Sequence, residues 1–526
     1  MLLQMPATVP EPSAADAELR LRARTALHRK SLSRPLRQAC NDDLIEPSTT
    51  VLDYGCGRGG DLARLRRAGV ACMGWDPAHR RRGSPGPADV VNLGFVVNVI
   101  EDPAERARTL RSAWSFAKRV LIVSARLRSD AGDLAGVPFR DGIRTSTGTF
   151  QKLFAQDELR TWVESTLGER VAVAGPGIVY VFRDPVTAQE WTLRRLRRVR
   201  RRAPVSRSLL ARHDGLLAPL IAFIEERGRL PRDGELEQST ELKRVFGSPR
   251  AAFATVRRVT GTEPWDEIRE LRSRDLLVFL ALARFGGRPR PKDLPDAVRL
   301  DVRDLFGSHR AACEQADRLL LAIADHDRMR AAADASSVGW ASSTAMCVHA
   351  DAIAELPPVL RVLDGVARQL VGELPSATVV KLSLGTPTVT YFEYPDFDRV
   401  PHPTLASAYE VSLDRLDCVY RDYSGHDDPP ILHRKEILLS TSDPRRARFA
   451  RLTRQEQRAG LYRDPAGIGR RSEWQRRVES VGAYYRGHRL VRRGPNQSTP
   501  TRHDRSRSGT RTRRVPETTA IPVNRQ

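Results

Sequence analysis

The residues with the clearest chemical potential form the segment Val51-Leu52-Asp53-Tyr54-Gly55-Cys56-Gly57-Arg58-Gly59-Gly60-Asp61. An apolar run leads into an acid and then into a turn with glycine at alternate positions, before a helical pattern begins. Glycines let the backbone take positive φ and approach a ligand closely. The first turn of a helix adds exposed N–H groups. The pattern therefore predicts a loop that binds a nucleotide-like ligand.

A second acid, Asp76, ends the next apolar run, in Gly74-Trp75-Asp76-Pro77. An acid at this place can accept both hydroxyls of a ribose, as it does in nicotinamide cofactor sites. Trp75 or Pro77 could flank an adenine. A turn with an aspartate as helix cap explains Asp76 equally well when it is taken alone.

The glycine spacing departs from the Gly-x-Gly-x-x-Gly of dinucleotide-binding proteins, and the acid before the glycines is the distinguishing feature. With that acid, the segment resembles motif I of class I methyltransferases, in which it lies near the methionine part of S-adenosylmethionine (SAM). The resemblance implies SAM as the cofactor. The implied binding residues are Asp53, Tyr54, Gly55, Gly57, Gly59, Asp76 and Asn92.

The third chemical segment, from Ala88 to Pro103, has two interpretations. Amino-directed DNA methyltransferases carry Asn/Asp-Pro-Pro-Tyr/Phe here, whose polar side chain holds the target amine while the ring stacks on the flipped base. Asn92-Leu93-Gly94-Phe95 keeps the first and last of these residues without the prolines. The ending Val-Ile-Glu-Asp-Pro is typical of many RNA and small-molecule methyltransferases. Asn92, Phe95 and Asn98 are the candidate catalytic residues, and a purely structural role for the asparagines stays open.

Short apolar runs alternate with amphipathic stretches from Thr49 to Asp184, and these elements must position the candidate residues. Strands are expected at 49–55, 70–76, 88–94 and 119–125, helices at 61–69 and 103–117, and a hairpin at 170–184. The alternation predicts a parallel, doubly wound, Rossmann-like α/β sheet. A helix from about Leu21 to Cys40 should precede it and contain the basic segment at 28–35.

The chain has 526 residues, which is too many for one core. The expected order is a disordered segment (1–20), the SAM-binding domain (21–190), a basic helical linker (191–207), helical repeats (208–335), an α+β domain (345–490) and a disordered basic tail (491–526). In the α+β domain, hairpins are expected at 378–395 and 408–424. The tail contains no Leu, Phe, Trp or Tyr and cannot bury a core.

Residues 216–256 and 276–316 form an internal repeat, marked by Phe246-Gly247-Ser248 and Phe306-Gly307-Ser308. Each copy predicts an apolar helix, a turn, a short helix, and a Phe-Gly-Ser turn whose serine caps another helix. The copies resemble the short helical repeats associated with homing endonucleases. That resemblance implies DNA contacts by Arg250 and Arg310. The alternative is a helical spacer with the two phenylalanines in its core.

The formal net charge is +23 and the isoelectric point about 10.6, which favours a polyanionic partner. Arginine-rich composition from GC-rich coding is the alternative explanation. The six cysteines form no CxxC pair, so we expect no metal site and no disulfides, and a reducing cytoplasm. No run of eighteen apolar residues and no secretory signal is present, so no membrane partner is expected.

Several segments together resemble the methyltransferases associated with bacterial DNA phosphorothioation, from about residue 25 to 490. They are HRKSLSRP, VLDYGCGRGGD, GWDP, DVVNLGFVVNVIEDP, LPPVLRV, YPDFDRVPHP and PPILHRKE. The resemblance implies a SAM-dependent methyltransferase that acts on DNA, with proteins of the phosphorothioation system as partners. An RNA or small-molecule methyltransferase remains an alternative, as does a non-catalytic DNA-binding factor that senses SAM. His433-Arg434-Lys435-Glu436 could line a DNA track or a pocket, or be solvated.

Overall fold

The computed structural model describes residues 21–26, 31–80, 84–130, 136–196 and 207–492. The segment His28-Arg29-Lys30, the predicted disordered segment 1–20, residues 197–206 of the predicted linker and nearly all of the predicted tail lie outside these ranges. The chain divides into two compact units. The first comprises Met1–Leu196, Leu282–His309 and Arg368–Leu374, and the second Arg197–Ala281, Arg310–Ala367 and Pro375–Gln526. None of the described helices combines the length and apolarity needed to cross a membrane.

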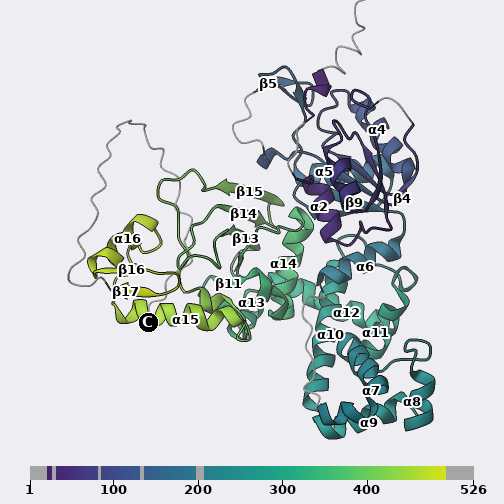
Figure 1. Ribbon diagram of the computed structural model, residues 1–526, viewed down its shortest axis with the longest axis vertical. Coiled ribbons are helices and arrows are strands. Elements are labelled where there is room, and N and C mark those ends of the chain that lie inside the picture. Colours follow the sequence, from purple (N-terminus) through teal and green to yellow (C-terminus); the bar gives the residue numbers. More distant parts are fainter. Residues whose placement is uncertain (1–20, 27–30, 81–83, 131–135, 197–206, 493–526) are drawn as a thin grey trace, which may run out of the picture. The chain divides into compact units, whose positions relative to one another are not determined.

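A six-stranded sheet forms the centre of the first unit, in the order β2-β1-β3-β4-β9-β8. Figure 1 labels β4 and β9 of this sheet. The strands are β1 (Thr50–Tyr54), β2 (Ala71–Trp75), β3 (Ala88–Gly94), β4 (Ala117–Ser124), β8 (Val171–Gly175) and β9 (Ile178–Phe182). The first four are parallel, and β9 and β8 form an antiparallel hairpin next to β4. A mixed α/β fold with a parallel core is therefore confirmed, with its strands where the apolar runs predicted them.

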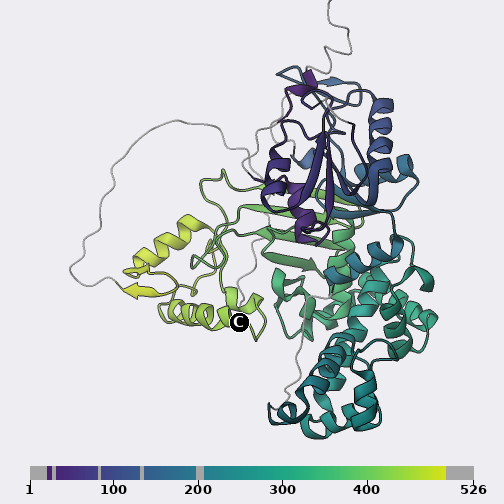
Figure 2. The ribbon, with the colours of Figure 1, turned by 45° about the vertical axis from the view of Figure 1, so that its right-hand side comes forward.

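Helices cover both faces of this sheet (Figure 2). They are α2 (Arg34–Asn41), α3 (Gly60–Arg67), α4 (Pro103–Phe116), α5 (Gln156–Leu167) and α6 (Pro185–Leu196). Successive strand residues point to opposite faces. Accordingly Leu52 packs in the core cluster that contains α4 and α5, whereas its neighbour Val51 packs in the cluster that contains α2 and α6.

The N-terminal helix is shorter than the sequence predicted. Residues 21–23 are helical, residues 31–33 are not, and α2 begins only at Arg34. Ser33 is extended, with ψ of 152°, and Pro35 occupies the first turn of α2. Proline is favoured at a helix start because its missing N–H is not needed there. The sequence also missed a small antiparallel sheet of β5 (Gly136–Phe139), β6 (Gly142–Thr145) and β7 (Phe150–Gln151).

The helical region between residues 207 and 334 contains two copies of the same order of helices. The first copy contains α7 (Arg207–Arg227), α8 (Ser239–Phe246) and α9 (Pro249–Thr260), and the second α10 (Glu263–Leu282), α11 (Asp296–Phe306) and α12 (His309–Leu321), followed by α13 (His326–Asp334). Gly247 and Gly307 end the short helices with φ of +81° and +78°. Ser248 Oγ accepts from Ala251 N at 3.0 Å, which confirms the expected cap. The second copy falls in both units, with α11 in the first.

The second unit contains a wholly antiparallel sheet in the order β10-β11-β12-β13-β14-β15. Its strands are β10 (Trp340–Ala341), β11 (Ala345–His349), β12 (Val379–Ser383), β13 (Thr388–Glu393), β14 (Ser407–Ser412) and β15 (Asp417–Asp422). Both expected hairpins are confirmed, whereas β10 and β11 were missed. The α-helices and other strands that follow are α15 (Pro444–Arg458), α16 (Arg471–Ser480), β16 (Ala483–Tyr485) and β17 (Leu490–Arg492), and α14 (Pro358–Val371) passes into the first unit from Arg368.

Candidate functional site

The carboxyl ends of β1 and β3 open onto a cavity of about 1650 Å³ in the first unit. From β1 the chain passes to β2 on one side, and β3 lies on the other side of β1. In open parallel sheets, ligands bind at the carboxyl ends where the strand order reverses in this way. The residues predicted for the cofactor and for catalysis line the cavity, with Gly59 as the exception. They are Asp53, Tyr54, Gly55, Gly57, Asp76, Asn92, Phe95 and Asn98.

The glycine turn is sterically required. Gly55, Gly57 and Gly59 have φ of +91°, +51° and +76°, and a Cβ on Gly55 would lie 2.3 Å from Val96 Cγ2. Several N–H groups of this turn are already used within the fold. The N–H groups of Gly55 and Cys56 donate to Trp75 O at 2.7 and 3.2 Å, and Gly59 N donates to Cys56 O at 2.9 Å. These donors hold the turn in shape, so the glycines offer a ligand their Cα surface instead.

Asp76 holds this turn against the end of β2. Its Oδ2 accepts from Gly57 N at 3.0 Å, and its Oδ1 accepts from Ala78 N and His79 N at 2.9 and 2.8 Å. These contacts confirm a turn held by the aspartate, but residues 77–79 form a turn and not the start of a helix, so the predicted helix cap needs correction. A carboxylate has about four acceptor sites, so capacity for a hydroxyl group remains. The ribose role of Asp76 therefore stays a prediction.

Asp53 and Asn92 stand opposite each other in the register of β1 and β3. Asn92 Nδ2 donates to Asp53 Oδ1 at 2.8 Å, which fixes the orientation of the amide because a carboxylate only accepts. The two residues are 4% and 2% exposed. Asn92 Oδ1 is buried without a hydrogen-bond partner. An unsatisfied buried acceptor costs roughly 1–3 kcal/mol, which indicates that a ligand donor belongs here.

A second unsatisfied acceptor lies in the turn after β3. Asn98 Nδ2 donates to Gln151 Oε1 at 3.0 Å, and Asn98 O accepts from Lys152 N at 2.7 Å. Asn98 is 2% exposed, and its Oδ1 is buried without a partner. Ser33 Oγ, which also belongs to a cavity-lining residue, is in the same state. Buried polar atoms that line one cavity and lack partners are typical of a ligand site rather than of a packed core.

Phe95 is held in a strained conformation at the end of β3, with φ of +60°. Its N–H lies 2.9 Å from Ser124 O and 3.2 Å from Ser124 Oγ, and these two acceptors on β4 keep it there. Positive φ in a bulky residue is uncommon and tends to occur at functional sites. The cavity wall is also aromatic at Tyr54 and Trp75, whose ring centroids are 4.7 Å apart.

The Cys56 thiol, on the glycine turn, does not supply a nucleophile. Burial, with the negative charges of Asp53 and Asp76, raises its pKa to about 12. A thiolate is therefore scarce at neutral pH. Within the described ranges, no three His, Cys, Asp or Glu side chains are grouped so as to hold a metal ion.

Sequence reasoning missed two parts of the cavity wall. Residues 22–26 line it, and Arg22 is paired with both Glu105 carboxylate oxygens at 2.5 and 2.9 Å. The small sheet contributes Thr145, Thr149 and Gln151. The helix predicted from Leu21 did not indicate that its first residues line a cavity, and strands of two to four residues are too short for a periodic pattern that distinguishes them from loops.

The predicted DNA contacts lie on other elements. Arg250 is exposed in the first turn of α9, and Arg310, in the first turn of α12, is 90% exposed and pairs with Glu314 Oε1 at 2.9 Å. Neither lines the cavity. Their contact with DNA stays a prediction.

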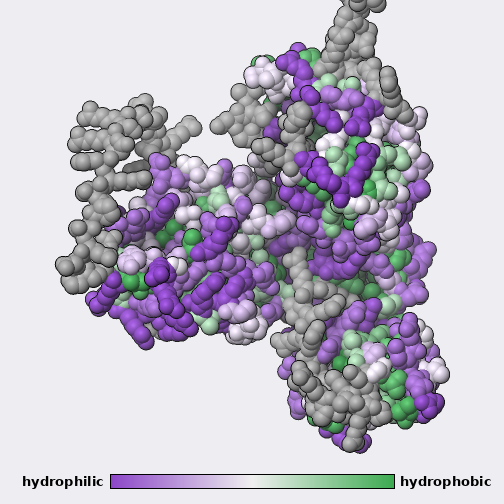
Figure 3. Space-filling model, viewed as in Figure 1, coloured by the Kyte–Doolittle hydropathy of each residue, from purple (hydrophilic) through white to green (hydrophobic). Residues whose placement is uncertain are grey.

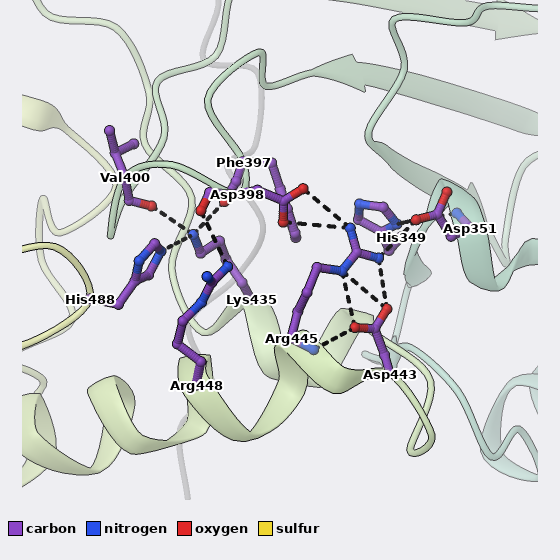
Figure 4. A network of polar contacts seen from close by, with 10 residues as sticks. All are labelled: His349, Asp351, Phe397, Asp398, Val400, Lys435, Asp443, Arg445, Arg448 and His488. Carbon is purple, nitrogen blue, oxygen red and sulfur yellow. Dashed lines mark hydrogen bonds and ion pairs between the residues drawn. The ribbon is translucent and has the colours of Figure 1, made fainter.

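Of the His433-Arg434-Lys435-Glu436 motif, Lys435 and Glu436 are buried, and Lys435 lies in a polar network of the second unit (Figure 4). Lys435 Nζ donates to Phe397 O, Val400 O and His488 Nε2 at 2.5, 2.7 and 3.2 Å. Burial, with the nearby Arg448 guanidinium, lowers the pKa of Lys435 to about 7. Three donors meet three acceptors, so this lysine ties the 397–400 segment to His488 and has no donor left for a ligand.

No family model and no curated protein matches the chain. Among solved structures, it is similar to the sugar N-methyltransferase KedS8 from Streptoalloteichus, with 16% identity, a TM-score of 0.24, and coverage of 35% of this chain and 98% of that one. A SAM-dependent methyltransferase from Aquifex aeolicus matches with 17% identity, a TM-score of 0.22 and coverage of 31% and 96%.

An O-methyltransferase family protein from Burkholderia thailandensis matches with 16% identity, a TM-score of 0.20 and coverage of 28% of this chain. The chain spans 55% of the length of that protein. Similarity at these scores does not establish a family, so the geometry of the cavity has to support any function.

Proposed function

We propose that the chain is a methyltransferase that takes its methyl group from SAM bound in the cavity at β1 and β3. The observation that carries this proposal is the Asp53–Asn92 pair at the switch point. A buried carboxylate and an unpartnered amide oxygen suit the α-ammonium group of SAM, which has three N–H donors and one positive charge. The same pair would suit a neutral hydrophobic ligand poorly, because Asn92 Oδ1 would stay unsatisfied.

The other lining residues fit the remaining parts of SAM. Tyr54 and Trp75 offer an aromatic surface to the adenine, and Asp76 retains capacity for a ribose hydroxyl. When bound, SAM supplies a methyl group that its sulfonium has already activated. The chain then has to orient the acceptor and exclude water, and it needs no nucleophile of its own. The high pKa of the Cys56 thiol is consistent with a reaction that uses no protein nucleophile.

For the methyl acceptor we propose DNA, reached in the cytoplasm. The net charge of +23 favours a polyanion. Helix α15 adds a local feature, because Arg448, Arg451, Arg454 and Arg458 are all exposed on it while its one acid, Glu456, is fully buried. The space-filling view shows the surface around α15 as mainly hydrophilic (Figure 3). Arginines on one helix face can neutralise successive phosphates.

The link to a bacterial phosphorothioation system, and to its proteins as partners, rests on the motif resemblance. Two alternatives to a DNA methyltransferase are each supported by a feature of the sequence. The Val-Ile-Glu-Asp-Pro segment favours an RNA or small-molecule acceptor. The missing prolines after Asn92 favour a non-catalytic DNA-binding factor that senses SAM.

Calorimetry with SAM and with its demethylated product S-adenosylhomocysteine (SAH) tests the cofactor. Transfer from methyl-labelled SAM to duplex DNA, and separately to RNA, then tests the acceptor, with Asp53→Ala as the inactive variant. We expect heat with both cofactors and label on DNA that disappears in the variant. Binding without transfer to either nucleic acid would favour the sensor, and absence of heat would end the methyltransferase proposal.

A further inference from the structure

The cavity has a second group of polar lining residues that the SAM site does not use. It consists of Asn98 in the turn after β3, the β6–β7 connection with Thr145, Thr147 and Thr149, and Gln151 on β7. The three threonine hydroxyls lie within hydrogen-bond distance of one another, with Thr145 Oγ1 at 3.0 Å from Thr147 Oγ1 and 2.8 Å from Thr149 Oγ1. All of these side chains are uncharged. This wall is therefore polar and neutral.

Asn98 presents a fixed acceptor on this wall. Its amide nitrogen is committed to Gln151 Oε1, and its main-chain oxygen is committed to Lys152 N. The side chain is 2% exposed, so its unpartnered Oδ1 cannot be satisfied by bulk water. An acceptor that is rigid, desolvated and unsatisfied gains most from a ligand N–H or O–H.

The residues that line the cavity favour a substrate N–H over a substrate O–H as this donor. An alcohol is a poor nucleophile until a base removes its proton. The acidic lining residues are already assigned: Asp53 and Asp76 to the cofactor in the proposed function, Asp61 to Ser33 N at 2.9 Å, and Glu105 to Arg22. The lining histidine, His79, lies with its ring nitrogen 3.1 Å from Ala23 O. A neutral amine needs no such base, because its nitrogen keeps a lone pair while its N–H donates to Asn98.

We propose that Asn98 Oδ1 receives an N–H group of the substrate, and that the substrate is a planar amine of the amino-heterocycle class, methylated on that nitrogen. The inference rests on the proposed function. The nitrogen lone pair forms the new N–C bond while the S–C bond of the sulfonium donor breaks and its electron pair goes to sulfur. The methylated nitrogen then loses one proton to water. The ring of Phe95, which lines the same cavity, gives a planar substrate a surface on which to stack.

Calorimetry on SAH-saturated protein tests this with two probe pairs that differ by one amino group: adenine against purine, and cytosine against pyrimidin-2-one. We expect the wild-type chain to bind each amino probe at least about tenfold more tightly than its partner, the value of one buried hydrogen bond. Asn98→Leu should abolish this preference and leave SAH affinity unchanged. Asn98→Asp, which keeps the acceptor, should retain it, since the Gln151 amide can rotate to donate.

Gln156→Leu is the matched control. Gln156 also has a buried, unpartnered amide atom, but it does not line the cavity, so its variant should keep the preference. A wild-type chain that shows no preference, or an Asn98→Leu variant that keeps it, overturns the inference and leaves SAM binding intact. Absence of heat with SAH overturns the proposed function instead. The probe preference, measured then without SAH, still decides the role of Asn98.

Discussion

Each of the two units buries a group of polar side chains, and the two groups differ in how completely they are satisfied. In the second unit, the fully buried Glu456 accepts from His402 Nε2, Tyr485 Oη and Tyr462 Oη at 2.7, 2.7 and 2.9 Å. In the first unit, Asn92 and Asn98 each keep a buried oxygen without a partner. Hydrogen bonds completed within the fold stabilise it, whereas incomplete ones reserve capacity for a ligand. Substitutions should therefore separate the two groups, with loss of stability in one and loss of binding in the other.

The largest effect is expected at Glu456. Glu456→Ala removes three hydrogen bonds at once and leaves the buried donors only longer contacts, from His402 Nε2 to Tyr485 Oη at 3.1 Å and from Tyr462 Oη to His433 Nδ1 at 3.5 Å. We expect a loss of about 3–5 kcal/mol in the free energy of unfolding, measured by urea denaturation. Glu479→Ala, at an exposed position of α16, should change it by less than about 0.5 kcal/mol. A loss below about 1 kcal/mol at Glu456 would show that this network does not stabilise the second unit.

At Asp53 we expect a loss of SAM affinity with little loss of stability. Asp53→Asn keeps an oxygen for Asn92 Nδ2 but removes the negative charge that the proposed α-ammonium group requires. SAM affinity should fall by about 10- to 100-fold, the value of a charge-assisted hydrogen bond, while stability changes by less than about 1 kcal/mol. Asp89→Asn is the control. Asp89 lies near the start of β3, at the opposite end of the strand from Asn92, and its carboxylate accepts from Thr50. Equal affinity in the Asp53 and Asp89 variants would contradict the assignment of the ammonium site.

Alanine substitutions at Gly55 and Gly69 distinguish the cost of a strained backbone from the cost of a steric clash. Gly55→Ala meets both a positive φ and a Val96 methyl group at 2.3 Å, so it should destabilise the first unit by about 1–3 kcal/mol. Gly69 has a similar φ of +80°, and a Cβ there would meet nothing within 4 Å. Thermal unfolding of Gly69→Ala should therefore show only the conformational cost, about 1 kcal/mol. Similar losses in both variants would mean that Val96 moves away at little cost.

The sequence predicted the parts of the site that periodicity and glycine encode. The strands of the first sheet, the place of Asp53 before the turn, and the cap at Ser248 follow from local patterns. The pattern could not show that the turn's own amides are consumed by Trp75 and Asp76, because that depends on how β2 lies beside β1.

Tertiary contacts account for what the sequence left out. Asn98 meets Gln151 only because the small sheet of β5, β6 and β7 folds next to the turn after β3. For the motif at 433–436 the sequence left a DNA track, a pocket and a solvated cluster open, whereas Lys435 is buried and meets acceptors from residues 397, 400 and 488. Spacing within a motif does not reveal partners that come from elsewhere in the chain.

The effect expected at Lys435 is the one that depends on pH. Its pKa is lowered from 10.5 to about 7 in the folded chain, so above pH 7 the unfolded chain binds more protons there than the folded one. Stability should therefore rise with pH between about 7 and 10.5, by at most about 1.4 kcal/mol per pH unit from this group. Below pH 7 both states are protonated and the contribution becomes constant. Lys435→Met removes the titrating group, so the pH dependence of the variant should be flatter than that of the wild type in this window. Parallel pH profiles of the two proteins, measured by urea denaturation, would show that Lys435 keeps its ordinary pKa and that its three acceptors compensate fully for its burial.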